Sequence, residues 1–310
     1  MRGFLAALGA LLLLGSAGLI NNRVPQHRAD VPCHSVQSAS YAFLSYFGGT
    51  EVDDCDDIAV DNAGFIYVVC HSTSNDFPGA ERERSRRDMD AYVSKIDPRT
   101  GRRVYTTRIG GSAWDGAIRV VVSSTGQAFV AGFTKSADFP MTARAVQPTY
   151  GGGDSDAFLV ILDAGGNIRH ATLVGGSGAE QCDGLAVDRA GTVYLVGATW
   201  SEDLPGAGRS RYHGDGDVFI TRLHPSRTLS LRSYYLGGGG SEKGTGAILD
   251  NRGTLYVAGF TESQDFPVKA AFQAEPGGRS DAFLARLRAS DLSIISSTYV
   301  GGSGEDAAWG

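Results

Sequence analysis

The sequence repeats itself, and this repeat restricts the fold more than any other feature. A Gly-Gly pair recurs with spacings of 62, 65, 62 and 64 residues, beginning at Gly48, Gly110, Gly175, Gly237 and Gly301. Between successive pairs the same segments return in the same order: an apolar run ending in a glycine turn, an aromatic-centred run, Ser-x-Asp-(Phe/Leu)-Pro and Asp-(Ala/Val)-aromatic. Such a repeat predicts a modular fold in which neighbouring units pack on one another.

Each repeat has the pattern of four short strands. In the third repeat these are residues 185–188, 193–199, 217–223 and 229–236, which are rich in β-branched and aromatic residues. The turn at 188–191 suits a tight hairpin, with glycine where a positive φ is needed. The 43 glycines argue against a helical bundle, since a glycine inside a helix is destabilising by about 1 kcal/mol. The predicted fold is all-β, with four-stranded antiparallel β-propeller blades, and a β-solenoid is the competitor.

The repeated motifs resemble those of the bacterial SBBP repeat, the seven-bladed β-propeller repeat. The resemblance rests on Tyr-x-Gly-Gly-Ser-Gly, Ala-Val-Asp-x-x-Gly-x-x-Tyr-Val-x-Gly-x-Thr, Ser-x-Asp-Phe-Pro and Gly-Gly-x-x-Asp-Ala-Phe, best matched in residues 235–299. It covers about residues 41–310. It implies a propeller in an exported or cell-surface bacterial protein, and it supplies no catalytic residues.

The repeat boundaries predict the domain organisation. The units are at about 48–109, 110–174, 175–236 and 237–300, followed by the start of a fifth at 301–310. Residues 41–47 look like the outer strand of a preceding blade, so outer strands outnumber complete sets of inner strands. A propeller ring often closes by pairing strands from its two ends. We therefore expect an incomplete ring of four complete blades plus partial ones, from a longer protein truncated at its C-terminus. The complete ring would have at least five blades, and seven if the resemblance holds.

The N-terminus has the features of a secretion signal. Arg2 precedes an uncharged apolar run from Phe4 to Leu14, which is followed by small residues at 15–18. We expect a signal peptide at 1–18, a polar leader at 19–40, and an exported chain that is extracellular, periplasmic or at the cell surface. An uncleaved membrane anchor is the alternative, because the apolar run to Ile20 approaches the length that spans a bilayer.

One acidic side chain recurs five residues after the first glycine of every pair. The five are Asp53, Asp115, Glu180, Glu242 and Asp306. On a propeller they predict either a ring of carboxylates at the channel mouth that holds a cation, or local caps on the N–H groups of each Gly-rich turn. Recurrence in every repeat favours the local caps.

Metal, cofactor and nucleic-acid signals are weak. The Asp-rich run at 53–57 lacks the alternating spacing of a calcium loop, so Ca²⁺ stays the weaker option there. The six histidines show no zinc spacing, and the chain has no P-loop or G-x-S-x-G motif. A net charge of −6 gives no electrostatic reason to expect nucleic acid. We predict no catalytic residues, no cofactor and no metal ligands.

Four cysteines in an exported chain permit disulfides. Folding the first hairpin about residues 62–63 places Cys55 opposite Cys70, so we expect a bridge between them. Cys33 and Cys182 would form the remaining pair. The alternative is that the cysteines are free, buried small side chains.

Two connecting loops depart from the repeat. Residues 81–88 are a run of Glu and Arg, which is either a basic docking patch or a solvated loop with self-neutralising charges. The third repeat carries an aromatic and basic set that is a candidate contact for a carbohydrate or a protein: Trp200, Arg209, Arg211, Tyr212 and His213.

The repeated polar residues favour a scaffold over an enzyme, because an active site needs a few unrepeated groups that converge on one point. We predict an exported, non-enzymatic binding, adhesion or structural scaffold at the cell surface. Its partner would be a glycan or a protein, and it would meet the membrane only through its N-terminal segment. The alternatives are a propeller hydrolase or lyase, and a repeat module of a larger protein with a separate effector or anchor domain.

Overall fold

A computed structural model describes residues 45–79, 88–225 and 231–309, which form sixteen strands and no helix. The chain divides into two units, Met1–Phe47 and Gly48–Gly310, and all the strands belong to the second. The strand expected at 41–47 lies mostly outside the described residues, and residues 45–47 form no strand. The strands are β1 (Asp53–Val60), β2 (Ile66–Ser72), β3 (Asp90–Asp97), β4 (Arg102–Ile109), β5 (Asp115–Val122), β6 (Ala128–Thr134), β7 (Asp156–Leu162), β8 (Ile168–Val174), β9 (Glu180–Val187), β10 (Val193–Thr199), β11 (Asp217–Leu223), β12 (Arg232–Leu236), β13 (Glu242–Leu249), β14 (Thr254–Thr261), β15 (Asp281–Arg288) and β16 (Ile294–Val300).

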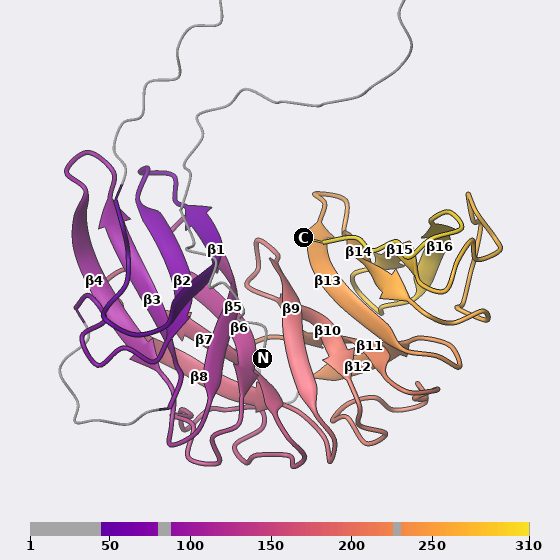
Figure 1. The fold of residues 1–310 in the computed structure, drawn as a ribbon, viewed down its shortest axis with the longest axis horizontal. Coiled ribbons are helices and arrows are strands. Elements are labelled where there is room, and N and C mark those ends of the chain that lie inside the picture. The colour runs from indigo at the N-terminus through magenta and orange to yellow at the C-terminus, as the bar shows by residue number, and fades with distance from the viewer. Residues whose placement is uncertain (1–44, 80–87, 226–230, 310) are drawn as a thin grey trace, which may run out of the picture. The chain divides into compact units, whose positions relative to one another are not determined.

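These strands form four separate antiparallel sheets, each made of four consecutive strands. We call β1–β4, β5–β8, β9–β12 and β13–β16 blades one to four. The first strands of neighbouring blades contact one another in turn, β1 with β5, β5 with β9 and β9 with β13. Figure 1 shows the four blades in chain order without closure into a ring. The predicted all-β propeller of four-stranded antiparallel blades is confirmed.

The first hairpin of each blade follows from its turn residues. In blade three the Asp188 carboxylate accepts hydrogen bonds from the N–H groups of Ala190 and Thr192, both at 2.8 Å. Gly191 takes a φ of 84°, a left-handed conformation that favours glycine. Asp61 and Asp250 make the same pair of bonds in blades one and four. The turn is therefore encoded locally, before any packing between blades.

The hydrophobic core lies between neighbouring blades, in three clusters that join one blade to the next. Leu159 of β7 packs in the same cluster as Leu195 of β10, and both side chains are fully buried. Burying one such side chain stabilises the fold by roughly 1.5–3 kcal/mol. Ile220, the equivalent of Leu159 in blade three, is also fully buried, whereas Leu284 of blade four is 39% exposed. No further sheet covers that face of blade four within the described residues.

The phenylalanines of the Ser-x-Asp-Phe-Pro motif pack against the aromatic residue at the third position of the third strand of their own blade. The ring centroids are 4.2 Å apart for Phe77–Tyr92, 4.9 Å for Phe139–Phe158 and 4.8 Å for Phe266–Phe283. The two repeated motifs are therefore one packing unit, which closes the end of the blade near the connecting loops.

The connection between the second and third strands covers the outer edge of the blade. In blade three, Ser233 N donates to Gly206 O at 3.1 Å, and in blade four Lys269 and Ser297 exchange backbone hydrogen bonds of 3.0 and 2.8 Å. These bonds use backbone groups that an uncovered edge strand would offer to another chain. The same connection in blade three lines the pocket described below.

Candidate functional site

Each recurrent acidic residue is hydrogen-bonded to the Gly-Gly loop of its own repeat. Asp115, at the start of β5, accepts a hydrogen bond from Gly111 N at 2.7 Å. The Thr134 and Ser136 hydroxyls at the end of β6 also donate to Asp115, the latter at 2.8 Å. The equivalent glycine N–H bonds measure 2.7, 2.8, 2.9 and 2.7 Å at Asp53, Glu180, Glu242 and Asp306.

A second carboxylate completes the same loop. Asp138, of the Ser-x-Asp-Phe-Pro motif, accepts hydrogen bonds from Ser112 N at 2.7 Å and Ser112 Oγ at 2.8 Å. Ser136 Oγ accepts one from Ala113 N at 2.9 Å. Three successive N–H groups, those of residues 111–113, are thereby bonded to side chains. The same arrangement recurs at Asp76, Asp203 and Asp265.

Each of these carboxylates therefore stabilises the Gly-Gly loop of its own repeat. Asp115 and Glu180 are fully buried and Glu242 is 1% exposed. Burial raises the pKa of Asp115 to about 6 and also raises the pKa of Glu180, against the opposing effect of their hydrogen bonds. This geometry is that of local caps on the N–H groups of each Gly-rich turn. Among the described residues no group of three or more His, Cys, Asp or Glu side chains is arranged to hold a metal ion.

The acidic residue that begins each third strand was not assigned a role from the sequence. Asp156 is fully buried on β7, and its Oδ2 atom accepts a hydrogen bond from Gly151 N at 2.7 Å. A Cβ atom added at Gly175 would collide with Asp156 and would lie 2.7 Å from Glu180 Oε2. The two carboxylates therefore flank the first glycine of the pair, and glycine is required because a side chain has no room.

This pairing of carboxylates recurs at three junctions between blades. The glycine and its two flanking acids are Gly110 with Asp90 and Asp115, Gly175 with Asp156 and Glu180, and Gly237 with Asp217 and Glu242. Burial, helped by the neighbouring glutamate, raises the pKa of both Asp156 and Asp217 to about 7. Within the described structure, the Oδ1 atoms of these two aspartates are buried and accept no hydrogen bond. A recurring Asp at a strand start was the only sequence signal for this feature.

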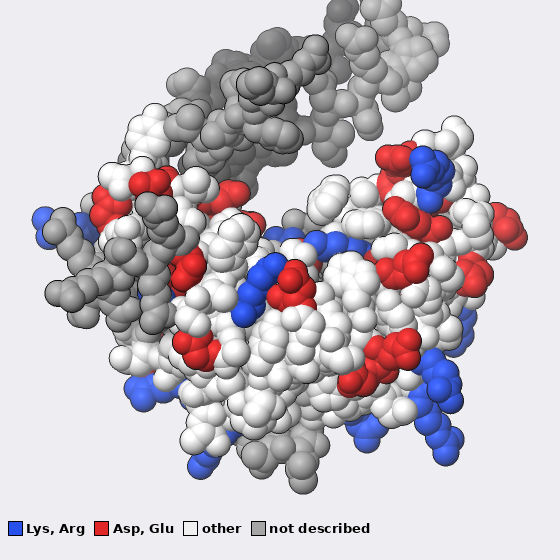
Figure 2. All heavy atoms as spheres, turned by 60° about the horizontal axis from the view of Figure 1, so that its bottom comes forward, with Lys and Arg blue, Asp and Glu red and all other residues white. Residues whose placement is uncertain are grey.

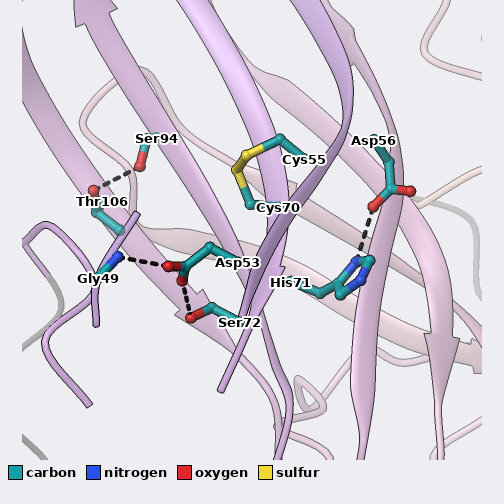
Figure 3. Close-up of a disulfide and its surroundings, with 9 residues drawn as sticks. All are labelled: Gly49, Asp53, Cys55, Asp56, Cys70, His71, Ser72, Ser94 and Thr106. Carbon is teal, nitrogen blue, oxygen red and sulfur yellow. Dashed lines mark hydrogen bonds and ion pairs between the residues drawn. A yellow bond between two sulfur atoms is a disulfide. The ribbon is translucent and has the colours of Figure 1, made fainter. Parts of the chain in front are cut away.

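The Asp-rich run of β1 sends its side chains in different directions. Figure 3 shows Asp53 bonded to the Gly49 N–H and the Ser72 hydroxyl, while Asp56 pairs with His71 at 2.9 Å. Asp57 instead accepts a hydrogen bond from Val120 N of blade two at 2.9 Å. The carboxylates of Asp53, Asp56 and Asp57 are thus bound to other protein groups.

Cys55 and Cys70 form a disulfide between β1 and β2 (Figure 3). The two residues are direct cross-strand partners in this hairpin. Cys182 is a free, buried thiol, and burial raises its pKa to about 12. Its suggested partner, Cys33, lies outside the described residues.

The first strand of each blade contains a β-bulge, and one arginine donates hydrogen bonds to backbone carbonyl groups of two bulged residues. The bulged residues are Asp56, Ile118, Asp183 and Thr245. The Arg119 guanidinium donates from Nε to Asp183 O at 2.7 Å and from Nη2 to Thr245 O at 3.0 Å. Lys243 Nζ lies 3.1 Å from Asp183 Oδ1. These charged groups differ from blade to blade, but their contacts join blades two, three and four.

A pocket unlike anything expected from the repeat lies on blade three. It has a volume of about 650 Å³ and is lined by residues 206–211, His213, β12 residues 232–235 and the blade-four turn at 291–292. Three lining side chains are arginines: Arg209, Arg211 and Arg232. The sequence singled out Arg209, Arg211 and His213 but missed Arg232, because its approach depends on how the loop lies against β12.

The two aromatic residues of the sequence-predicted set are placed differently. Neither Trp200 nor Tyr212 lines the pocket. Tyr212 packs edge-on against Tyr235, a residue of the pocket lining, with ring centroids 5.9 Å apart. Trp200 is 47% exposed and approaches Gly216 on the same connection.

Two further predictions fall outside the described residues. The signal peptide and leader belong to residues 1–40, and the charged run at 81–88 is described only at Asp88. In the part of the chain that is described, no helix has the length and apolar character to cross a membrane.

Comparison with known proteins gives one family match. Residues 43–78 match the SBBP beta-propeller repeat model. No curated protein matches the chain.

The chain also aligns with solved structures at low similarity. BamB from Moraxella catarrhalis is 12% identical with a TM-score of 0.30, over 78% of this chain and 63% of that one. A mutant of the Synechocystis apocarotenoid oxygenase is 10% identical with a TM-score of 0.34, over 83% and 64%. The chain thus spans less than two thirds of the length of these structures, and likenesses this weak carry no functional argument.

The family match covers the first Gly-Gly loop, the first hairpin and the Ser-x-Asp-Phe-Pro motif. Those are the segments whose hydrogen bonds recur in the later blades. Residues 43–78 therefore match an SBBP β-propeller repeat, and the chain repeats the segments of this unit in four β-propeller blades.

Proposed function

We propose that this chain is an exported, non-enzymatic β-propeller scaffold that binds a ligand at the cell surface. The observation that carries this proposal is the division of its polar side chains. The acidic and hydroxyl groups repeated in the blades are bonded to their own loops, whereas three arginines line the blade-three pocket and the described residues at the position of Arg232 in the other blades include no arginine. A single site on a repeated framework is the arrangement expected of a binding scaffold.

Export is supported by two independent features. The first residues have the order of a secretion signal, with a basic start, an apolar run and small residues. The Cys55–Cys70 disulfide is of the kind that persists in oxidising compartments and is rare in the cytosol. We therefore place the folded chain outside the cytoplasm, at the cell surface, in the periplasm or in the medium.

An enzyme is the second candidate, and one observation favours it. Burial raises the pKa of Asp156 and Asp217 to about 7, and carboxyl groups with raised pKa values gather at active sites. Against this, the same pair of carboxylates recurs at three junctions and flanks a glycine backbone each time. A third candidate is a repeat module with a separate effector domain, which the sequence of the intact gene would decide.

The experiment is to incubate the purified chain with fractionated cell-envelope polysaccharides and to measure both co-sedimentation and release of reducing ends. We expect saturable binding with no cleavage. Cleavage that is lost in Asp156→Asn would establish the enzyme instead. A chain that sediments with no fraction and cleaves none contradicts the scaffold proposal.

A further inference from the structure

Blade three differs from the other blades at one position of its outer strand. Arg232 is the first residue of β12 and is exposed at the pocket. The strand registers place Tyr105, His170 and Ser296 at the equivalent positions of blades one, two and four. Arg209 and Arg211 lie on the connection that runs along the same edge. Three permanently charged side chains therefore line this pocket, and the described residues at the position of Arg232 in the other blades include no arginine.

A fourth arginine lies directly opposite the first. Arg222 of β11 is the cross-strand partner of Arg232, so two positive side chains stand on the same face of the sheet. Like charges directly opposite each other destabilise a sheet. Within the described structure, Arg222 Nε is buried and has no hydrogen-bond partner. The Arg222 guanidinium therefore keeps a buried hydrogen-bond donor that no described residue uses.

The acidic residues near the pocket already form hydrogen bonds or ion pairs with other residues. Asp291, the one acidic residue of the lining, accepts hydrogen bonds from the Ser293 N–H and hydroxyl and pairs with Arg288. Asp217 accepts a hydrogen bond from His213 N at 2.9 Å. None of the four arginines forms an ion pair with any of the described residues. The pocket therefore keeps a local positive charge, although the whole chain carries a net charge of −6.

Charged side chains are unevenly distributed on the face of the molecule drawn in Figure 2. In the space-filling view, Lys and Arg side chains project along the lower margin of the molecule, while most Asp and Glu side chains lie above it (Figure 2). Guanidinium groups bind planar oxyanions through paired hydrogen bonds, so the residue type fits carboxylate, sulfate and phosphate equally. The volume of about 650 Å³ lies within the range of pockets that enclose a small organic group.

We propose that the blade-three pocket binds the oxyanion group of an anionic ligand, with Arg209, Arg211 and Arg232 as the binding side chains. The inference rests on the proposed scaffold function and names the chemistry of its ligand. A carboxylate or sulfate on an acidic polysaccharide and a free phosphate share this chemistry. Arg222, the cross-strand partner of Arg232, strengthens the positive potential at Arg232.

The test is a titration of the full chain with four probes: sodium phosphate, sodium sulfate, oligogalacturonate and a neutral malto-oligosaccharide of similar length. Binding is followed by calorimetry and by the rise in melting temperature. Two single pocket variants are tested. Arg232→Ser places the equivalent residue of blade four at this position, and Arg209→Ala is the second. Arg252→Ala, an exposed arginine on the blade-four hairpin, is the matched control.

We expect binding of at least one anionic probe, no binding of the neutral oligosaccharide, and a loss of affinity of about tenfold or more in each pocket variant. Arg232→Ser removes a like-charge contact, so its melting temperature without ligand should equal or exceed that of the parent chain. Tighter binding of oligogalacturonate than of phosphate identifies an acidic polysaccharide as the source, and the reverse identifies free phosphate.

Three outcomes overturn the inference. One is that no anionic probe binds, and another is that Arg252→Ala weakens binding as much as Arg232→Ser does. The third is that the neutral probe binds as well as the anionic ones. If envelope polysaccharide still binds in the co-sedimentation experiment while the pocket variants behave like the parent chain, the scaffold function stands and only the pocket assignment fails.

Discussion

Arg119 holds the main-chain carbonyl of Asp183 across the boundary between blades two and three, with an Nε–O distance of 2.7 Å. The same guanidinium reaches Thr245 O in blade four at 3.0 Å. Both acceptors are the extra residues of β-bulges, whose backbone groups are released from the strand ladder. One side chain therefore fixes the first strands of three successive blades.

Replacing Arg119 should loosen the contacts between blades. Arg119→Ala leaves two carbonyl groups without their charged donor, and we expect the free energy of unfolding to fall by about 1–3 kcal/mol. Denaturant unfolding followed by circular dichroism measures this loss. Arg252→Ala, on an exposed hairpin, should change stability by less than about 0.5 kcal/mol. Equal stability of the Arg119 and Arg252 variants would show that the bridge contributes nothing.

The paired carboxylates make stability depend on pH. Burial raises the pKa of Asp156 and Asp217 to about 7, so the folded protein binds protons more tightly than the unfolded chain does. Each group therefore stabilises the fold at low pH and loses this contribution as pH rises through about 7, by up to about 1.4 kcal/mol per pH unit. Asp156→Asn should be more stable than the parent chain at pH 8 and should show a flatter dependence between pH 5 and 7.

The control for this pH effect is an aspartate with the opposite shift. Hydrogen bonds from Asn167 hold the pKa of Asp163 down, at about 2. Asp163→Asn should therefore lose its effect on stability only as the pH falls below about 4, and it should leave the slope near pH 7 unchanged. Melting temperatures measured from pH 3 to pH 9 distinguish the two variants. An unchanged slope in Asp156→Asn contradicts the raised pKa.

The disulfide of blade one should contribute measurably to stability. Cys55 and Cys70 are 15 residues apart, and closing a loop of that length stabilises a fold by about 3 kcal/mol. We expect a lower melting temperature in the double variant Cys55→Ala, Cys70→Gly, which carries the residues found at 117 and 132 in blade two. A reducing agent should have the same effect on the parent chain and none on the variant.

Gly175 should tolerate no side chain. Gly175→Ala forces a methyl group between Asp156 and Glu180, and we expect a loss of about 1–3 kcal/mol. Gly165→Ala is the matched control, because a Cβ there meets its nearest neighbours at 3.4 and 3.5 Å, an ordinary contact distance. Thermal unfolding of both variants measures the difference, and similar melting temperatures would contradict this account of the repeated glycine.

Several features of this protein could be predicted from local sequence. The turn of each first hairpin depends on residues at most four apart, such as Asp188 and Thr192, so the pattern and the structure agree. Cys55 and Cys70 were placed opposite each other by folding the strand about its turn, and they are cross-strand partners in the structure. The recurrent acids were expected near their Gly-Gly turns because each lies only four residues after the glycine whose N–H it accepts.

The sequence by itself determined the repeat, the all-β blades and the turns, since these depend on residues close together in the chain. Only the tertiary structure decided which polar groups meet across blades. Arg119 and Thr245 are 126 residues apart in the sequence. They meet because the bulges of β9 and β13 leave the carbonyl groups of Asp183 and Thr245 within reach of one guanidinium. Such contacts follow from the positions of whole sheets, and no local pattern encodes them.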